Sequence, residues 1–247
     1  MTLPGFFAKH PRAALGFSGG VDSSYLLYAA VQSGAVVRPY FIKTAFQPAF
    51  ELADAQKLAL QVGAELTVIE TEILSVPRVA ENPQDRCYYC KTALFSLLRE
   101  RAKADGFTLL LDGTNASDDA GDRPGMRALR ELEVRSPLRE CGLMKDEIRR
   151  LSREAGLFTW AKPAYACLAT RVPVGEPLSA ALLAKIESAE DALLRLGFSD
   201  FRVRVFHGAA RVQLPTEQWE KAAARRAEIL CVLQQYFSVV LLDMEVR

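Results

Sequence analysis

The segment Ser18-Gly19-Gly20-Val21-Asp22-Ser23-Ser24 combines residue types that can hold a chain of phosphates. It follows an apolar run, 13–17, and opens a stretch with helical spacing of apolar residues, 22–33. Paired glycines let backbone N–H groups turn toward an anion, and a helix N-terminus adds partial positive charge. The three serines can donate hydroxyl hydrogen bonds, whereas Asp22 can hold the Mg²⁺ that bridges phosphates. We therefore interpret residues 18–24 as a phosphate-binding loop rather than a glycine turn with a helix cap.

The surrounding sequence narrows the kind of nucleotide site. The chain has no Gly-x-x-x-x-Gly-Lys-Ser/Thr motif and no Gly-x-Gly-x-x-Gly motif, which argues against a P-loop kinase and against a dinucleotide site. A second polar segment, Asp112-Gly113-Thr114-Asn115, follows another apolar run, 108–112. We expect it to border the nucleotide, although the same composition is common in ordinary turns.

Three cysteines form a second group that could do chemistry. Cys87 and Cys90 make a Cys-x-x-Cys pair, and Cys167 follows farther along the chain. Zinc would need a fourth ligand, and neither His10 nor His207 stands at a convincing metal spacing. Three thiolates suit a [4Fe–4S] cluster with one open iron. The alternatives are inert packing or a thioredoxin-like redox pair.

Alternating apolar runs and helical periodicities surround these motifs. Strands are predicted over 13–17, 36–42, 66–69 and 108–112, and helices over 22–33, 47–62 and 91–104. Strands that alternate with helices predict an α/β fold with a doubly wound, mainly parallel sheet. Ligands of such sheets bind outside the carboxyl ends of the strands, where the loop 18–24 and Asp112–Asn115 are expected.

The pattern changes near residue 178. A helix over 179–196, strands over 201–206 and 211–214, a helix over 216–235 and a strand over 239–246 predict a smaller α+β domain. The proline- and glycine-containing stretch 172–177 reads as a linker. We expect domains at 1–175 and 176–247, the second completing the substrate site or forming an oligomer interface.

Composition limits the compartment and the partners. Of 247 residues, 50% are hydrophobic and 25% charged, as in a globular protein, and the net charge of +1 argues against nucleic acid or a membrane as partner. No membrane-length apolar stretch and no signal-peptide pattern is evident. Five cysteines argue against a disulfide framework, and Cys141 and Cys231 are expected to be ordinary buried residues. We expect a cytoplasmic protein.

The loop 18–24 resembles the signature of the PP-loop, or adenine nucleotide alpha hydrolase, superfamily. Its members have a HUP-like fold, split ATP between the α and β phosphates, transfer AMP to a carboxylate or carbonyl oxygen, and release pyrophosphate. The resemblance implies adenylation but leaves the acceptor open.

Further segments are similar to the LarE family over about residues 13–175, and the remainder has the size and element order of that family's smaller domain. These segments are 86–91, 112–119, 122–125, 136–138, 142–149 and 160–168. The resemblance implies an ATP-dependent sulfur transferase that adenylates carboxylates of pyridinium-3,5-biscarboxylic acid mononucleotide. The resulting thiocarboxylates belong to the nickel-pincer nucleotide.

The LarE resemblance also implies cofactors and roles. ATP and Mg²⁺ would occupy the loop, with Mg²⁺ on Asp22. In one branch of the family Cys167 would sacrifice its own sulfur and become dehydroalanine. In the other, Cys87, Cys90 and Cys167 would hold a [4Fe–4S] cluster that carries an extra sulfide. All three cysteines are present, which favours the cluster branch. A homo-oligomer, with a hexamer as one form, is also implied.

A substrate with carboxylates and a phosphate needs cations. The candidates are Arg171, Arg202, Arg204 and Arg211, because the guanidinium fork matches both groups. Arg171, four residues after Cys167, is the stronger candidate, whereas the other three could equally form a solvated face of a hairpin. Rival functions are a tRNA-thiolating enzyme, an amidotransferring synthetase and a non-enzymatic nucleotide-binding regulator.

Overall fold

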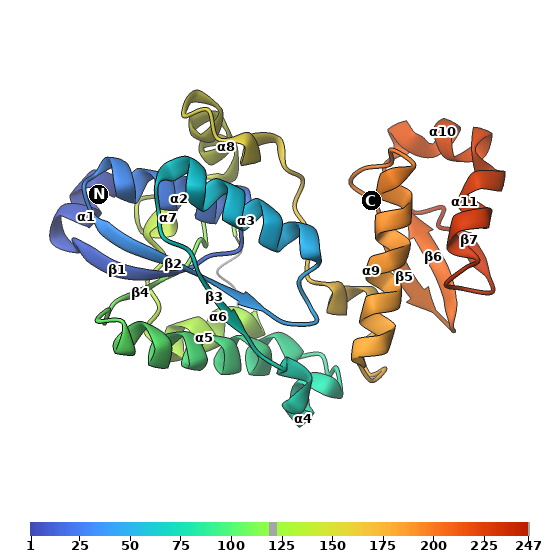
Figure 1. Cartoon of the computed structure of the whole chain (residues 1–247), viewed down its shortest axis with the longest axis horizontal. Helices are drawn as coiled ribbons and strands as arrows, with labels where there is room; N and C mark the ends of the chain where they lie inside the picture. The colour runs from blue at the N-terminus through green and yellow to red at the C-terminus, as the bar shows by residue number, and fades with distance from the viewer. Residues whose placement is uncertain (119–122, 247) are drawn as a thin grey trace. The chain divides into compact units, whose positions relative to one another are not determined.

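The computed structural model describes residues 1–118 and 123–246, so Asp119 and Asp122 of the segments quoted above lie outside the described residues. Figure 1 shows the chain, which divides into two compact units. Unit 1 comprises Met1–Val79 and Asp85–Lys162, and unit 2 comprises Ala80–Gln84 and Pro163–Arg247. Each unit is described by itself.

A four-stranded parallel sheet forms the centre of unit 1. Its strands are β1 (Arg12–Gly16), β2 (Val36–Lys43), β3 (Thr67–Glu70) and β4 (Leu110–Leu111), in the order β3-β2-β1-β4. Every pairing in this sheet is parallel. The predicted α/β class with a doubly wound, mainly parallel sheet is confirmed.

Helices cover both faces of this sheet, as Figure 1 shows for α2 and α3 on one face and α5 and α6 on the other. Their bounds are α1 (Leu3–Lys9), α2 (Val21–Gln32), α3 (Ala49–Val62), α5 (Arg86–Ala104) and α6 (Pro124–Glu131). Along β1 successive side chains point to opposite faces. Leu15 therefore joins the cluster that contains Leu26, whereas Ala14 joins the cluster that contains Leu98. The sheet has a separate apolar core on each side.

The remaining elements of unit 1 are short, apart from one helix. They are η1 (Ile73–Ser75), α4 (Pro77–Ala80), α7 (Pro137–Glu140), α8 (Lys145–Glu154) and η2 (Phe158–Ala161). Helix α8 packs against α2, with Ile148 fully buried in the same core as Leu26. This packing brings the N-terminus of α8 toward the start of α2.

Two predicted boundaries in unit 1 were wrong. The helix expected over 91–104 begins five residues earlier, at Arg86, so Cys87 and Cys90 lie inside its first two turns. The strand expected over 108–112 has two residues, although Ala14 N also donates to Leu109 O at 2.8 Å. Beyond Leu111 the backbone N–H of Asp112 instead bonds to Arg135 O.

Unit 2 holds a three-stranded sheet and its helices. The elements are η3 (Leu168–Arg171), α9 (Ala180–Arg195), β5 (Arg202–Phe206), β6 (Ala209–Gln213), η4 (Thr216–Gln218), α10 (Trp219–Ala224), α11 (Arg226–Leu233) and β7 (Val240–Leu242). Strands β5 and β6 are antiparallel, and β7 joins β6 in parallel. The predicted α-β-β-α-β order is confirmed, except that the helix expected over 216–235 is three short pieces. The chain bends at Arg225, whose guanidinium bonds to Leu196 O and pairs with Glu228.

The division between the units differs from the predicted linker at 172–177. Gly175 N donates to Asn82 O at 2.8 Å, and Asn82 Nδ2 donates to Pro173 O at 2.8 Å. These bonds tie the supposed linker to residues 80–84 inside unit 2, and the chain divides between Lys162 and Pro163 instead. Within the described parts of the chain, no helix is long and apolar enough to cross a membrane.

The core beneath the loop provides a stability test. Leu26 is fully buried and Leu60 is 83% exposed, and both lie on helices of unit 1. Leu26→Ala should lower the free energy of unfolding of unit 1 by about 2–5 kcal/mol because it leaves a cavity. Leu60→Ala should change it by less than about 0.5 kcal/mol. Urea denaturation followed by Trp160 fluorescence in a Trp219→Phe background measures both. Equal losses in the two variants would contradict this assignment of the core.

Candidate functional site

The loop between β1 and α2 has the geometry of an anion cradle. Helix α2 begins at Val21, and no side chain caps its N-terminus at Gly20. Gly19 has φ +70°, and a Cβ there would lie 3.1 Å from the backbone of Ala55 on α3. Glycine is needed at this position for both reasons. The uncapped N–H groups of the first turn of α2 remain available to an anion.

The serine hydroxyls gather around this turn. Ser18 Oγ lies 3.1 Å from Ser23 Oγ and accepts a bond from Gly20 N at 3.3 Å. Ser23 Oγ also donates to Gly20 O at 3.3 Å. Ser24 is fully buried, and its Oγ has no hydrogen-bond partner among the described residues. The loop therefore presents two hydroxyls already arranged around the helix start.

The segment after β4 forms the adjacent wall. A Cβ on Gly113 would lie 2.9 Å from Ser23 N, so the two backbones approach as closely as glycine permits. The Asp112 carboxylate accepts bonds from Thr114 N, Thr114 Oγ1 and, at 2.6 Å, Ser136 Oγ. These bonds fix Asp112 in the wall. Residues 112–115 therefore lie beside the loop, where the sequence predicted them.

Asp22 is held by two donors. Its Oδ1 accepts from Asn115 Nδ2 at 3.3 Å, and its Oδ2 lies 2.6 Å from Lys145 Nζ. Lys145 is the first residue of α8, and its backbone N–H donates to Ser117 Oγ at 2.8 Å. Sequence reasoning missed Lys145 as a contact of the loop, because only tertiary packing of α8 on α2 brings it there.

A second lysine that was not predicted also approaches the loop. Lys162 Nζ lies 3.5 Å from Gly19 O and 2.6 Å from Asp54 Oδ2. Lys162 is far from both partners in sequence, so no local pattern predicted these contacts. Together with Lys145 it places two cations beside the loop 18–24.

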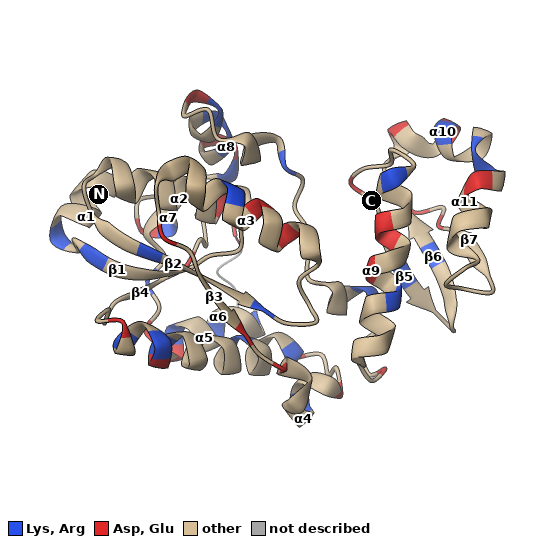
Figure 2. Ribbon diagram, viewed as in Figure 1, with Lys and Arg blue, Asp and Glu red and all other residues tan. Residues whose placement is uncertain are grey.

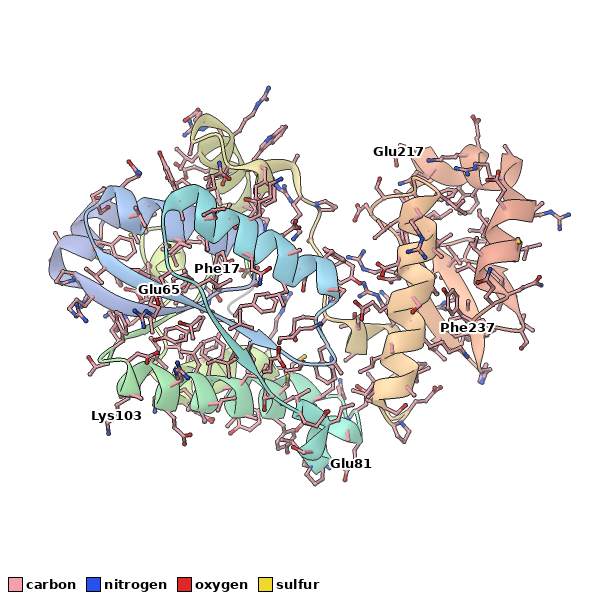
Figure 3. The ribbon with its side chains drawn as sticks, viewed as in Figure 1. Phe17, Glu65, Glu81, Lys103, Glu217 and Phe237 are labelled. Atoms are coloured by element: carbon pink, nitrogen blue, oxygen red, sulfur yellow. The ribbon has the colours of Figure 1, made fainter. Side chains whose placement is uncertain are left out.

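A pocket of about 380 Å³ opens beside the loop, between the ends of β1, β2 and β4. Phe17, labelled in Figure 3, is among its apolar lining residues. The other apolar lining residues are Phe41, Ile42, Leu94, Phe95 and Leu98, and polar lining comes from Ser18, Asp22, Ser23, Gln47, Lys91, Asp112, Thr114 and Asp118. Tyr40 also lines it; burial, then its bond to Asp105, raises the Tyr40 pKa to about 12, so its phenol stays neutral. An apolar wall beside a polar end suits a nucleotide.

The predicted cysteines divide between the units. Cys87 and Cys90 lie at the start of α5 in unit 1, and Arg86 Nη2 approaches Cys87 Sγ at 3.8 Å. Cys167 precedes η3 in unit 2 and is half-buried. Within neither unit do the described residues gather three or more His, Cys, Asp or Glu side chains fit to hold a metal. The three-cysteine site stays a prediction.

The other two cysteines differ from expectation. Cys231 is exposed on α11, and Cys141 is half-buried, so the expectation that both are buried was wrong. Burial raises the pKa of the Cys141 thiol. Cys231 is exposed because the short helix α11 buries only Leu233 among its residues.

Arg171 lies in a buried ion pair of unit 2. Its Nε lies 2.7 Å from Glu190 Oε1 and its Nη2 lies 3.1 Å from Glu190 Oε2. Its Nη1 donates to Ala166 O and to Thr170 Oγ1, both at 2.9 Å. Arg171 therefore anchors the backbone beside Cys167, a role that its sequence position did not reveal.

Arg202 also holds the backbone near Cys167. It is 5% exposed and donates to Phe201 O and Ala164 O, both at 2.6 Å. The Tyr165 ring has the guanidinium carbon of Arg171 4.6 Å and that of Arg202 5.0 Å from its centroid. Burial, then the charge of Arg171, lowers the Arg202 pKa to about 10, so it remains a cation at neutral pH.

A pocket of about 340 Å³ lies in unit 2, where Figure 2 shows basic positions along β5 and β6. Three of the four predicted arginines line it, namely Arg171, Arg204 and Arg211. Arg204 Nη1 donates to Thr170 O at 2.6 Å, and Arg211 Nε lies 3.3 Å from Asp243 Oδ2. Burial lowers the pKa of Arg204. His207, in the hairpin turn, also lines the pocket and was not predicted.

Comparisons with known proteins give the family. The chain is 33% identical over 216 residues to the pyridinium-3,5-bisthiocarboxylic acid mononucleotide synthase of Lactiplantibacillus plantarum, which covers 87% of this chain and 78% of that one. It is 37% identical over 250 residues to an uncharacterized protein of Synechocystis sp. (99% and 92% covered). An uncharacterized protein of Methanocaldococcus jannaschii is 26% identical over 242 residues (96% and 91% covered). No family model matches the chain. The identity and coverage of the synthase, together with the loop after β1, show that this chain belongs to the LarE family of the PP-loop superfamily.

Proposed function

We propose that this protein is an ATP-dependent sulfur transferase that converts carboxylates of pyridinium-3,5-biscarboxylic acid mononucleotide to thiocarboxylates. The single observation that carries the proposal is the uncapped start of α2, which faces the pocket of unit 1 in a chain related to a named synthase. That relative is named for a bisthiocarboxylic product, which supports an enzyme that places sulfur on carboxyl carbons.

The first half of the proposed reaction activates a carboxylate. A carboxylate resists nucleophiles because its leaving group would be oxide, whereas an acyl-adenylate loses AMP readily. The loop N–H groups with Ser18 and Ser23 would bind the phosphates, and the apolar wall with Phe17 would receive the base. Asp22 lines the pocket and its carboxylate is a ligand that Mg²⁺ favours, so the residues fit that ion. When bound there, Mg²⁺ would neutralise charge on the pyrophosphate.

The second half places sulfur on the activated carbon. Cys87 and Cys90 are three residues apart on α5, so both lie on one side of the helix, a spacing that fits two thiolate ligands of a [4Fe–4S] cluster. With Cys167 as third ligand, the bound cluster would supply a sulfide nucleophile. In the alternative, Cys167 gives up its own sulfur and becomes dehydroalanine.

The arginine-lined pocket of unit 2 is proposed to bind the anionic substrate. Arg211 and Arg204 line it with guanidinium groups that match phosphate and carboxylate. Arg171 and Arg202 are proposed to support this pocket by anchoring the backbone around Cys167. A cytoplasmic location and a homo-oligomeric state, with a hexamer as one form, belong to the same proposal.

Pyrophosphate release tests the proposed activity. Protein supplied with ATP, Mg²⁺ and the pyridinium biscarboxylate nucleotide should release pyrophosphate and AMP, with thiocarboxylate detected by mass spectrometry. Gly113→Ala should reduce release at least about tenfold, because its Cβ would lie 2.9 Å from Ser23 N and must shift the loop. Gly5→Ala, whose Cβ would meet a Thr2 side-chain atom at 3.3 Å, is the control with normal activity. Formation of ADP, or no substrate-dependent pyrophosphate, would refute the proposal.

Iron and sulfide analysis separates the two sulfur chemistries. Anaerobically reconstituted protein should show the broad brown absorbance of a [4Fe–4S] cluster. Cys87→Ala, Cys90→Ala and Cys167→Ala should each lose the colour, whereas Cys141→Ala and Cys231→Ala should keep it. A colourless, fully active wild type would reject the cluster. Mass spectrometry of Cys167 after turnover would then show whether dehydroalanine has formed.

Two arginine variants should fail in different ways. Arg211→Met should raise KM for the pyridinium nucleotide about tenfold with little change in unfolding free energy, because Arg211 lines the pocket at its partly exposed edge. Arg171→Met should destabilise unit 2 by about 3–5 kcal/mol, because it leaves Glu190 buried without its cation. Kinetics and denaturant unfolding measure the two effects. The reverse pattern would exchange the roles of these residues.

A further inference from the structure

The ion pair between Lys145 and Asp22 occupies the carboxylate that the proposed function gives to Mg²⁺. Lys145 Nζ lies 2.6 Å from Asp22 Oδ2, and Asn115 Nδ2 reaches the other oxygen at 3.3 Å. Both oxygens of Asp22 are therefore engaged by donors within the protein. A divalent cation that approaches Asp22 alone must displace the ammonium group or share the carboxylate with it.

The ion pair between Lys145 and Asp22 is placed where it can dissociate without unfolding the core. The side chains of Lys145 and Asp22 are 30% and 22% exposed, so neither is sealed in the core. The Lys145 backbone is fixed by its bond to Ser117 Oγ and by the start of α8, whereas its side chain is long and flexible. The ammonium group can therefore swing while its helix stays in place.

A triphosphate changes the balance of charge at this point. It would lie on the first turn of α2, beside Asp22, and would bring several negative charges to the tip of Lys145. The ammonium group would then have phosphate oxygens as partners, and Asp22 would be released to the cation that accompanies the nucleotide. Cation binding and nucleotide binding become coupled through one lysine.

We propose that Lys145 is a displaceable counter-ion that keeps divalent cations off Asp22 until the nucleotide triphosphate binds. This role rests on the proposed function, because it takes Asp22 as the cation ligand. It makes Lys145 a positioning residue for ordered loading of the metal and the nucleotide. Coupling of this kind is reciprocal, so the cation should raise nucleotide affinity by the same factor by which the nucleotide raises cation affinity.

The test uses Mn²⁺ alone as the probe, followed by electron paramagnetic resonance of the full-length protein without nucleotide. Lys145→Met should bind Mn²⁺ about two- to five-fold more tightly than wild type, the range expected for loss of a partly exposed ion pair. With a non-hydrolysable ATP analogue present, this advantage should vanish and analogue affinity should fall. Lys145→Arg, which keeps a cation, should behave as wild type.

A matched control removes the same charge elsewhere in unit 1. Lys103, exposed near the end of α5 and labelled in Figure 3, serves because Lys103→Met changes net charge equally without touching the loop. Mn²⁺ affinity should be unchanged in this variant. An equal gain in Lys103→Met would show a general charge effect and overturn the role of Lys145.

The remaining outcomes separate this inference from the proposed function. If Lys145→Met and wild type bind Mn²⁺ equally, or if neither binds it without nucleotide, the counter-ion role is refuted. The proposed function survives that result provided that Asp22→Asn abolishes nucleotide-dependent Mn²⁺ binding. If Asp22→Asn leaves that binding intact, Asp22 is not the cation ligand, and both assignments fall.

Discussion

The approach of two backbones, at Gly113 and at Ser23, is the constraint on which the site in unit 1 depends. A Cβ on Gly113 would lie 2.9 Å from the Ser23 nitrogen, so any side chain there would force one of the two backbones to shift. Because β4 is adjacent to β1 in the sheet, the segment after β4 meets the first turn of α2 directly. That contact brings Asn115 to Asp22 and completes one wall of the pocket. The segments that follow β1 and β4 thus meet at the carboxyl edge of the sheet and line a cavity large enough for a nucleotide.

Sequence patterns were enough to predict the sheet and the loop. Short apolar runs and period-3.6 apolar patterns located β1, β2, α2 and α3 to within a few residues, because these elements bury apolar surface in the core. The start of α5 was missed because Cys87 to Cys90 follow no apolar period. The division at Lys162 was missed as well, because hydrogen bonds with Asn82 hold the proline- and glycine-containing stretch that resembled a linker. Such bonds join residues distant in sequence and leave no local signal.

The candidate sites show the same limit more sharply. The residue types of the loop 18–24 predict an anion site. No local pattern connects Lys145 to Asp22, because the packing of α8 on α2 makes that contact. Among the arginines, type and proximity to Cys167 favoured Arg171 as a substrate ligand. In the structure its fork is closed on Glu190, whereas Arg211 stands at the pocket edge. Arginine identity predicts an anionic partner, and only the fold decides whether that partner is a ligand or a glutamate.

The two guanidinium groups near the Tyr165 ring have a consequence for how the neighbouring chain can vary. Arg171 and Arg202 hold the segment before Cys167 by donating hydrogen bonds to the carbonyl oxygens of residues 166 and 164. Every amino acid possesses such a carbonyl group. These hydrogen bonds to the segment before Cys167 therefore do not depend on which side chains occupy those two positions. Descendants of this protein could exchange them to reshape the surroundings of the sulfur atom without loosening the hold on the backbone that carries it.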